Sequence, residues 1–144
     1  MDDGHAILEE LRTQFASYSR PDDFIDRRHC CECEEHYAEL LDVPVEAFEY
    51  AHVENQGWDA TCFLTPDAFR YYFPALARVA QENPLDWMQA LVMRLPLHYT
   101  DSFSPHDCAL TVRLLEHWWT RSDLDEATRH AIAGALRALA TRHP

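Results

Sequence analysis

Residues 65–81 read TPDAFRYYFPALARVAQ, and this stretch predicts the fold class. Thr65, Pro66 and Asp67 form a typical helix start, with a hydroxyl at the cap, proline at the first helical position and an acid against the helix dipole. The apolar residues that follow lie on or near one helical face, as expected for a core helix. They are Phe69, Tyr72, Phe73, Leu76 and Val79. Pro74 removes a backbone hydrogen bond inside this helix, so we expect a kink or a break there.

Similar local signals predict helices on both sides of this stretch. Residues 3–19 and 31–42 each carry an apolar stripe, and Pro44 ends the second of these helices. A further helix starts at Asn83 and Pro84 and ends at Pro96. Capping boxes at 104–107 and 122–125 start the last two helices.

The chain therefore reads as about six helices joined by short polar connections. No run alternates with the period of two that marks a strand, and the chain has only three glycines. We predict one all-α domain over residues 1–144. Residues 45–64 form its irregular central loop, with a small hairpin as the alternative for that segment.

Length and composition narrow the class of protein. With 144 residues and 47% hydrophobic content, the chain can bury one core. No apolar run approaches the roughly 20 residues that span a bilayer, and the N-terminal MDDGHAILEE lacks the features of a signal peptide. We therefore expect a cytoplasmic protein with no membrane segment. The five cysteines fit thiols or metal ligands better than a disulfide framework.

The charge is strongly negative and unevenly distributed. The net charge is −13, and residues 1–60 hold 16 acidic residues against four arginines, whereas residues 61–144 hold nine against eight. This balance disfavours a nucleic-acid-binding protein, because phosphate contacts need basic patches. It favours a basic protein partner for the acidic N-terminal half. The alternative is a solvated acidic face that only keeps the protein soluble.

Residues 27–36, RRHCCECEEH, carry the strongest chemical signal. His29, Cys30, Cys33 and His36 form H-C-x-x-C-x-x-H, and thiolate and imidazole are the ligands that zinc prefers. Four donors on one regular helix cannot surround a tetrahedral ion, so a closed site needs a donor from elsewhere. Cys62 is the first candidate for that donor. Further candidates, in falling order, are His52 and then Cys108 and His98.

Two other interpretations of this segment stay open. The cysteines could be small buried hydrophobes beside exposed histidines, without any metal. Cys30 and Cys33 could instead form a redox dithiol, but the strand that usually precedes such a motif is missing. The sequence shows no nucleophile elbow, no glycine-rich phosphate loop and no H-E-x-x-H motif.

The stretches RHCCECEEHYAELL and NQGWDATCFLTPDAFRYYFPALARVA resemble an uncharacterised family of small bacterial proteins. That family shows an H-C-x-E-C-x-E-H-like stretch followed by a G-W-D-x-x-C-F and F-R-Y-Y-x-P-A-L-A-R-like stretch. The resemblance implies these signature positions: His29, Cys30, Cys33, His36, Gly57, Trp58, Asp59, Cys62, Tyr71 and Tyr72. It ties Cys62 to the first cluster and gives Cys31 no counterpart, so we exclude Cys31 as a ligand. The family carries no established activity.

Two hypotheses about function follow from these observations. The first is a non-enzymatic protein-binding module of the immunity or inhibitor kind, which neutralises a basic partner and holds a structural zinc ion. Its predicted metal ligands are Cys30, Cys33, Cys62 and one histidine, His36 before His29. The second is a metal- or thiol-dependent enzyme centred on Cys30, Cys33 and Cys62, which requires an open coordination position or an exposed thiol of low pKa.

Overall fold

The computed structural model describes residues 2–26, 32–54 and 59–142, and only the backbone of Glu32 and Cys33. Within these ranges the chain forms α-helices and no strand, apart from one isolated bridge between Ile25 and Leu64. The helices are α1 (Asp3–Phe15), α2 (Glu32–Leu40), α3 (Pro66–Glu82), α4 (Gln89–Arg94), α5 (Pro105–Trp119) and α6 (Glu126–Arg142). The predicted single all-α domain is confirmed. None of the helices described is long and apolar enough to cross a membrane.

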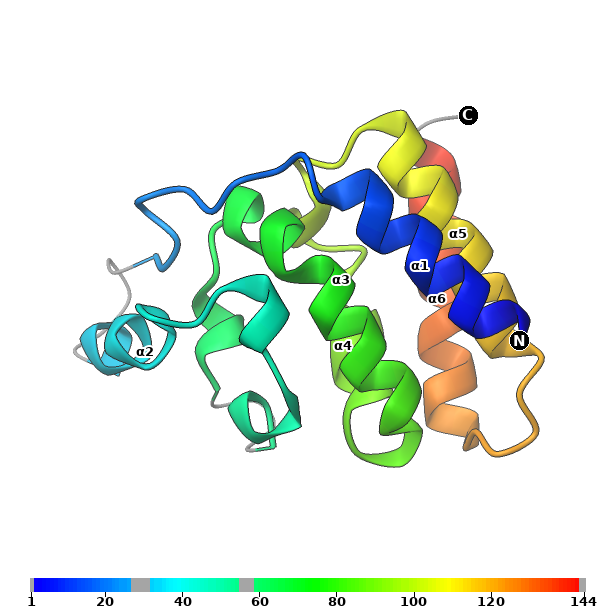
Figure 1. Ribbon diagram of the computed structural model, residues 1–144. Coiled ribbons are helices and arrows are strands. Elements are labelled where there is room, and N and C mark those ends of the chain that lie inside the picture. The colour runs from blue at the N-terminus through cyan, green and yellow to red at the C-terminus, as the bar shows by residue number, and fades with distance from the viewer. Residues whose placement is uncertain (1, 27–31, 55–58, 143–144) are drawn as a thin grey trace.

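Five of these helices form a body, and α2 lies apart from it (Figure 1). Helix α3 occupies the centre of the body, α1 runs along α5, and α6 packs against α4 and α5. Helix α2 packs on the short helix η3 (Ala60–Phe63) at one end of the molecule. The remaining short elements are η1 (Val45–Ala47), η2 (Tyr50–His52), the π-helical η4 (Pro84–Met88) and η5 (His98–Thr100).

Helix α3 confirms the predicted core face and corrects two details. The five apolar residues of that face are all buried. The helix is continuous through Pro74, so of the two predicted outcomes, a kink or a break, the break does not occur. Phe73 and Ala75 on either side of the proline are buried, and the packing of this face holds the helix together despite the missing hydrogen bond. The Thr65 hydroxyl does not cap the helix, because it donates to the Asp23 carbonyl at 2.8 Å.

The two predicted capping boxes differ in outcome. The Ser104 hydroxyl accepts from the Asp107 amide at 3.0 Å, and the Asp107 carboxylate accepts from the Ser104 amide at 2.9 Å, as predicted. The box at 122–125 is wrong, since α6 begins only at Glu126. There the Asp125 carboxylate accepts from the Thr128 amide at 2.8 Å, and Asp125 is therefore the residue that caps α6.

The central segment is irregular, as predicted, but its described residues contain no hairpin. Residues 45–54 form η1 and η2, and residues 60–63 form η3. Local hydrogen bonds close these turns, such as the 3.0 Å bond from the His52 amide to the Glu49 carbonyl. Phe48 and Val53 are buried between the turns. In a hairpin, the same amides would donate hydrogen bonds to the opposite strand instead.

Candidate functional site

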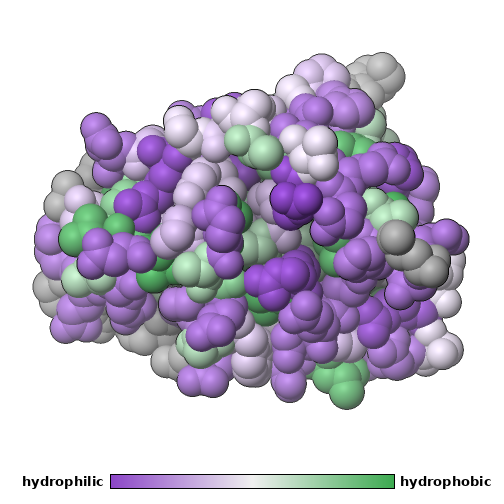
Figure 2. All heavy atoms as spheres, in the orientation of Figure 1, coloured by the Kyte–Doolittle hydropathy of each residue, from purple (hydrophilic) through white to green (hydrophobic). Residues whose placement is uncertain are grey.

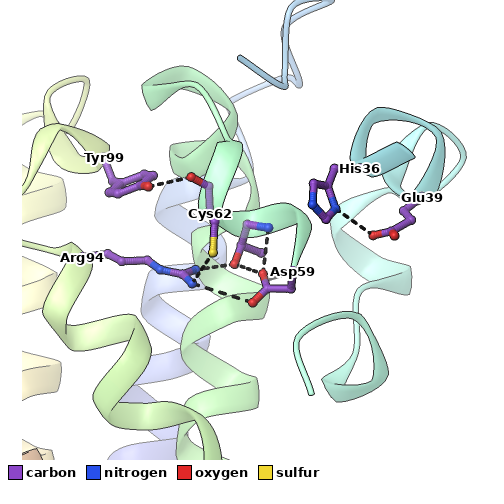
Figure 3. A network of polar contacts seen from close by, with 7 residues as sticks. His36, Glu39, Asp59, Cys62, Arg94 and Tyr99 are labelled. Atoms are coloured by element: carbon purple, nitrogen blue, oxygen red, sulfur yellow. Dashed lines mark hydrogen bonds and ion pairs between the residues drawn. The ribbon is translucent and has the colours of Figure 1, made fainter. Parts of the chain in front are cut away.

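The structure brings together a group of polar side chains between η3 and α4, which we call the Arg94 network (Figure 3). Its members are Asp59, Thr61, Cys62, Arg94 and Tyr99. The Asp59 carboxylate caps η3 by accepting from the Thr61 amide at 2.8 Å. Arg94 Nη2 lies 3.7 Å from the second Asp59 oxygen and donates to Cys62 Sγ at 3.2 Å. Tyr99 donates its hydroxyl proton to the Cys62 carbonyl at 2.8 Å.

Burial makes the Arg94 network a structural tie. Asp59 and Arg94 are only 5% and 8% exposed, so each charge depends on the other for compensation. Arg94 also donates to the Thr61 hydroxyl, and its guanidinium carbon lies 4.9 Å from the centre of the Trp87 ring. The network therefore fastens η3, the platform for α2, to the body. In the sequence, the only sign of the network is the single arginine in the apolar run LVMRLPL. No neighbouring residue indicates that Asp59 is the partner of this arginine.

The environment of Cys62 does not suit a thiolate nucleophile. Burial raises the pKa of the Cys62 thiol, and the nearby Asp59 carboxylate raises it further, while the Arg94 guanidinium lowers it to a lesser degree than burial raises it. The thiol is therefore protonated at neutral pH. A thiol-dependent enzyme needs the opposite shift.

The structure describes some of the predicted metal ligands and not others. His29 and Cys30 lie outside the described residues, and for Cys33 only its place in α2 is described. Cys62 is half-buried in η3, and its sulfur points towards Arg94 (Figure 3). The described residues contain no group of three or more histidine, cysteine, aspartate or glutamate side chains arranged to hold a metal ion. The four-ligand zinc site with Cys62 thus stays a prediction.

The His36 side chain is buried, and one of its two ring nitrogens has no hydrogen-bond partner among the described residues. Its side chain is buried on α2, 5% exposed, and its ring stacks on Phe63 with 4.9 Å between centroids. Nδ1 lies 3.4 Å from the Glu39 carboxylate. Nε2 is buried and has no hydrogen-bond partner among the described residues. A buried imidazole nitrogen without a partner is costly and calls for an explanation.

The lesser candidates for the extra donor are engaged elsewhere. The Glu49 amide donates to Nδ1 of His52 at 3.0 Å, and the His52 ring stacks on Phe48. Cys108 is buried in α5, where burial raises the pKa of its thiol. The exposed ring of His98 stacks on Tyr99 at 4.2 Å. Of His36, His52 and His98, His36 is the one with a buried ring nitrogen that has no hydrogen-bond partner among the described residues.

A second feature is the acidic lobe, which we define as residues 34–54. Its exposed carboxylates are Glu34, Glu35, Glu39, Asp42, Glu46, Glu49 and Glu54, and the sequence has no arginine or lysine between residues 28 and 70. Among the described residues, two arginines reach the lobe from outside, and both donate to main-chain carbonyls there. Arg20 donates to Leu40 at 2.7 Å and Arg78 to Phe48 at 2.6 Å.

Among the described residues, seven carboxylates outside the lobe form an ion pair with an arginine. Such pairs join, among others, Glu9 to Arg12, Glu10 to Arg113, Glu82 to Arg78, Asp101 to Arg142 and Asp123 to Arg121. Figure 2 shows the resulting hydrophilic surface, on which exposed hydrophobic side chains are scattered. One of them, Leu41, is 43% exposed inside the lobe. Comparison of the chain with family models, with curated proteins and with solved structures finds no match.

Proposed function

We propose that the protein is a non-enzymatic binding module of the immunity or inhibitor kind, whose acidic lobe binds a basic protein partner. One observation carries the proposal. Glu35, Asp42, Glu46 and Glu54 are exposed, and no arginine among the described residues forms an ion pair with them. Seven carboxylates outside the lobe, in contrast, pair with arginines of the same chain.

Physical chemistry supports a partner for such a surface. Like charges held close together repel one another and lower the stability of the folded state, so a region that retains them gains by meeting opposite charge. The lobe steers a basic protein towards itself, and this effect is strongest at low salt. Leu41 adds an exposed apolar side chain among these carboxylates, where it can pack against the partner once water is excluded.

A structural zinc ion at the start of α2 belongs to the same proposal. The thiols and imidazoles of residues 29–36 supply the donors. Helix α2 has nine residues, and helices of this length are marginal in isolation. An ion bound at its start would hold the lobe in one conformation before the partner arrives, which lowers the entropic cost of binding.

The test compares two variants with the same change of net charge. The lobe variant is Glu35→Gln, Asp42→Asn, Glu46→Gln and Glu54→Gln. The control variant is Glu10→Gln, Glu82→Gln, Asp101→Asn and Asp123→Asn. Each protein is immobilised and exposed to an extract of its source cells at low and high salt, and a retained protein is then purified and titrated in a calorimeter.

We expect the wild type and the control to retain the same basic protein at low salt. The lobe variant should bind it about 10- to 100-fold more weakly, since four exposed pairs contribute a few tenths of a kcal/mol to 1 kcal/mol each. Equal weakening in both variants would make net charge, not the lobe, responsible. Retention of no basic protein by the wild type would refute the proposed function.

A further inference from the structure

Arg20 binds the C-terminal end of α2 from outside the lobe. Residues 16–26 carry the chain from the end of α1 across to α2, and Arg20 lies in this connection (Figure 1). Its guanidinium donates from Nη1 to the Leu40 carbonyl at 2.7 Å and from Nη2 to the Leu41 carbonyl at 2.8 Å. A longer contact joins Nη1 to the Val43 carbonyl at 3.5 Å. One planar cation therefore contacts three carbonyls of the same turn.

This end of α2 lacks a cation of its own. The carbonyls at the end of a helix have no intrahelical donor, and they carry a partial negative charge that a basic side chain in the last turn often offsets. The last turn of α2 reads YAEL over residues 37–40 and has no basic residue, and its Glu39 adds negative charge. Arg20 supplies the missing donors and the missing charge. Both matter for a helix of only nine residues, which is marginal in isolation.

Aromatic contacts hold the guanidinium in this position. Its central carbon lies 4.2 Å from the centre of the Phe24 ring. Phe24 is buried, and its ring stacks on Tyr37 of α2 with 4.6 Å between centroids. From the body, the Tyr72 hydroxyl accepts from Arg20 Nη1 at 3.0 Å and donates to the Val43 carbonyl at 2.6 Å. Arg20 therefore connects α2 to α3, and it restrains the main chain at the end of α2.

Arg20 restrains the lobe without pairing with its carboxylates. None of the ion pairs between described residues includes Arg20. The restrained turn carries Leu41 and Asp42, and both side chains are exposed. These are the exposed apolar side chain and one of the four unpaired carboxylates that the proposed function assigns to the partner. The contact of Nη2 with the Leu41 carbonyl fixes the backbone from which both side chains project.

We infer that Arg20 is a positioning residue of the proposed binding surface, which holds the turn at the end of α2 so that Leu41 and Asp42 meet the basic partner together. The inference rests on the proposed function for the partner, whereas the restraint on α2 can be measured on the protein alone. Charge and position predict opposite effects of removing Arg20. Loss of a cation beside an acidic surface strengthens the attraction of a basic ligand. Loss of the restraint weakens binding, because the turn must then be ordered when the ligand binds.

The first measurement is amide hydrogen exchange, followed by mass spectrometry on the full chain. It compares the wild type with Arg20→Met and with Arg113→Met, a matched control that removes one positive charge from an exposed ion pair of the body. In Arg20→Met we expect peptides covering residues 34–43 to exchange at least about 10-fold faster, since hydrogen bonds to a charged group are lost there. Peptides of α5 and α6 should exchange as in the wild type.

The second measurement is a calorimetric titration of the same proteins with a nona-arginine peptide at low salt. It is made at a temperature at which circular dichroism shows that each variant is folded, and the lobe variant defined above serves to locate the peptide. We expect Arg113→Met to bind the peptide at least as tightly as the wild type does. Arg20→Met should bind about 3- to 10-fold more weakly, despite its greater negative charge. The lobe variant should bind most weakly.

The possible outcomes separate this inference from the proposed function. If Arg20→Met binds the peptide as tightly as Arg113→Met does, the positioning role is refuted and the acidic lobe remains the binding surface. Unchanged exchange over residues 34–43 in Arg20→Met refutes the restraint on α2. If the lobe variant binds as tightly as the wild type, the lobe itself is refuted as the site. A merely structural role of Arg20 would lower the urea midpoint of unfolding and leave the affinity of the folded protein unchanged, which would also overturn the inference.

Discussion

The helical body and the acidic lobe use charge in opposite ways. In the body, arginines pair with carboxylates of the same chain, as Arg113 does with Glu10 at 2.7 Å. In the lobe, the arginines that approach it hold the main chain, as Arg20 does at Leu40 and Leu41. Glu35, Asp42, Glu46 and Glu54 of the lobe are exposed and form no ion pair with a described arginine. The arginine–carboxylate ion pairs of the described residues thus all lie outside the lobe.

The lobe is also attached differently. Besides the buried side chains of Leu40, Phe48 and Val53, two tyrosine hydroxyls of α3 hold its main chain: Tyr72 donates its hydroxyl proton to the Val43 carbonyl at 2.6 Å, and Tyr71 accepts from the Val45 amide at 3.0 Å. These two tyrosines are signature positions of the resemblance. Their hydroxyls anchor the chain between α2 and η1.

The largest loss of stability is expected at the Arg94 network, which connects the lobe to the body. Arg94→Met leaves the Asp59 carboxylate buried without its counter-charge, and such a loss destabilises a protein by about 3–5 kcal/mol. Urea unfolding monitored by tryptophan fluorescence measures it. Arg113→Met is the control, because the ion pair it removes is exposed and screened by salt. Equal effects of the two substitutions would show that the Arg94 network carries no special stability.

Local signals explain what the sequence predicted correctly. The cap at Ser104, the apolar face of α3 and the ends of the helices at prolines depend on residues a few positions apart. Of the kink or break predicted at Pro74, the break does not occur, because tertiary packing of Phe73 and Ala75 outweighs one missing hydrogen bond. The start of α6 was misplaced by three residues because Asp125 competes with Ser122 as a cap.

The candidate site was harder to predict, because its contacts join residues that are far apart in the sequence. His36 was identified from its spacing to the cysteines, which is local information. Its contact with Phe63 and the contact of Cys62 with Arg94 join segments about 30 residues apart, and the sequence contains no local trace of either. Non-local pairs of this kind decide which donors can meet, so the ligand set could be only partly predicted.

The next effect concerns the two buried thiols of the body. Burial raises the pKa of both Cys62 and Cys108 above the ordinary thiol value of 9.0. The stability that comes from this shift is present below that value and is lost as pH rises through the raised folded-state pKa. We expect the melting temperature of the wild type to fall as the pH rises above 9.0, and to fall less in a Cys62→Ala, Cys108→Ala double variant. Parallel pH profiles of the two proteins would contradict the assignment.

The smallest effect is on the melting temperature and compares one glutamate-to-glutamine substitution in each region. The substitution should destabilise the body but not the lobe. A side-chain hydrogen bond from Arg113 holds the pKa of Glu10 below its ordinary value of 4.5, so the ionised form stabilises the fold above that pH. Glu10→Gln should lower the melting temperature at neutral pH, and the difference should shrink as the pH falls below 4.5 or salt is added. Glu46→Gln removes one of several like charges in the lobe and should leave the melting temperature unchanged or raise it. Scanning calorimetry at low salt measures both, and a decrease of equal size in the two variants would mean that the lobe carboxylates are already neutralised within the chain.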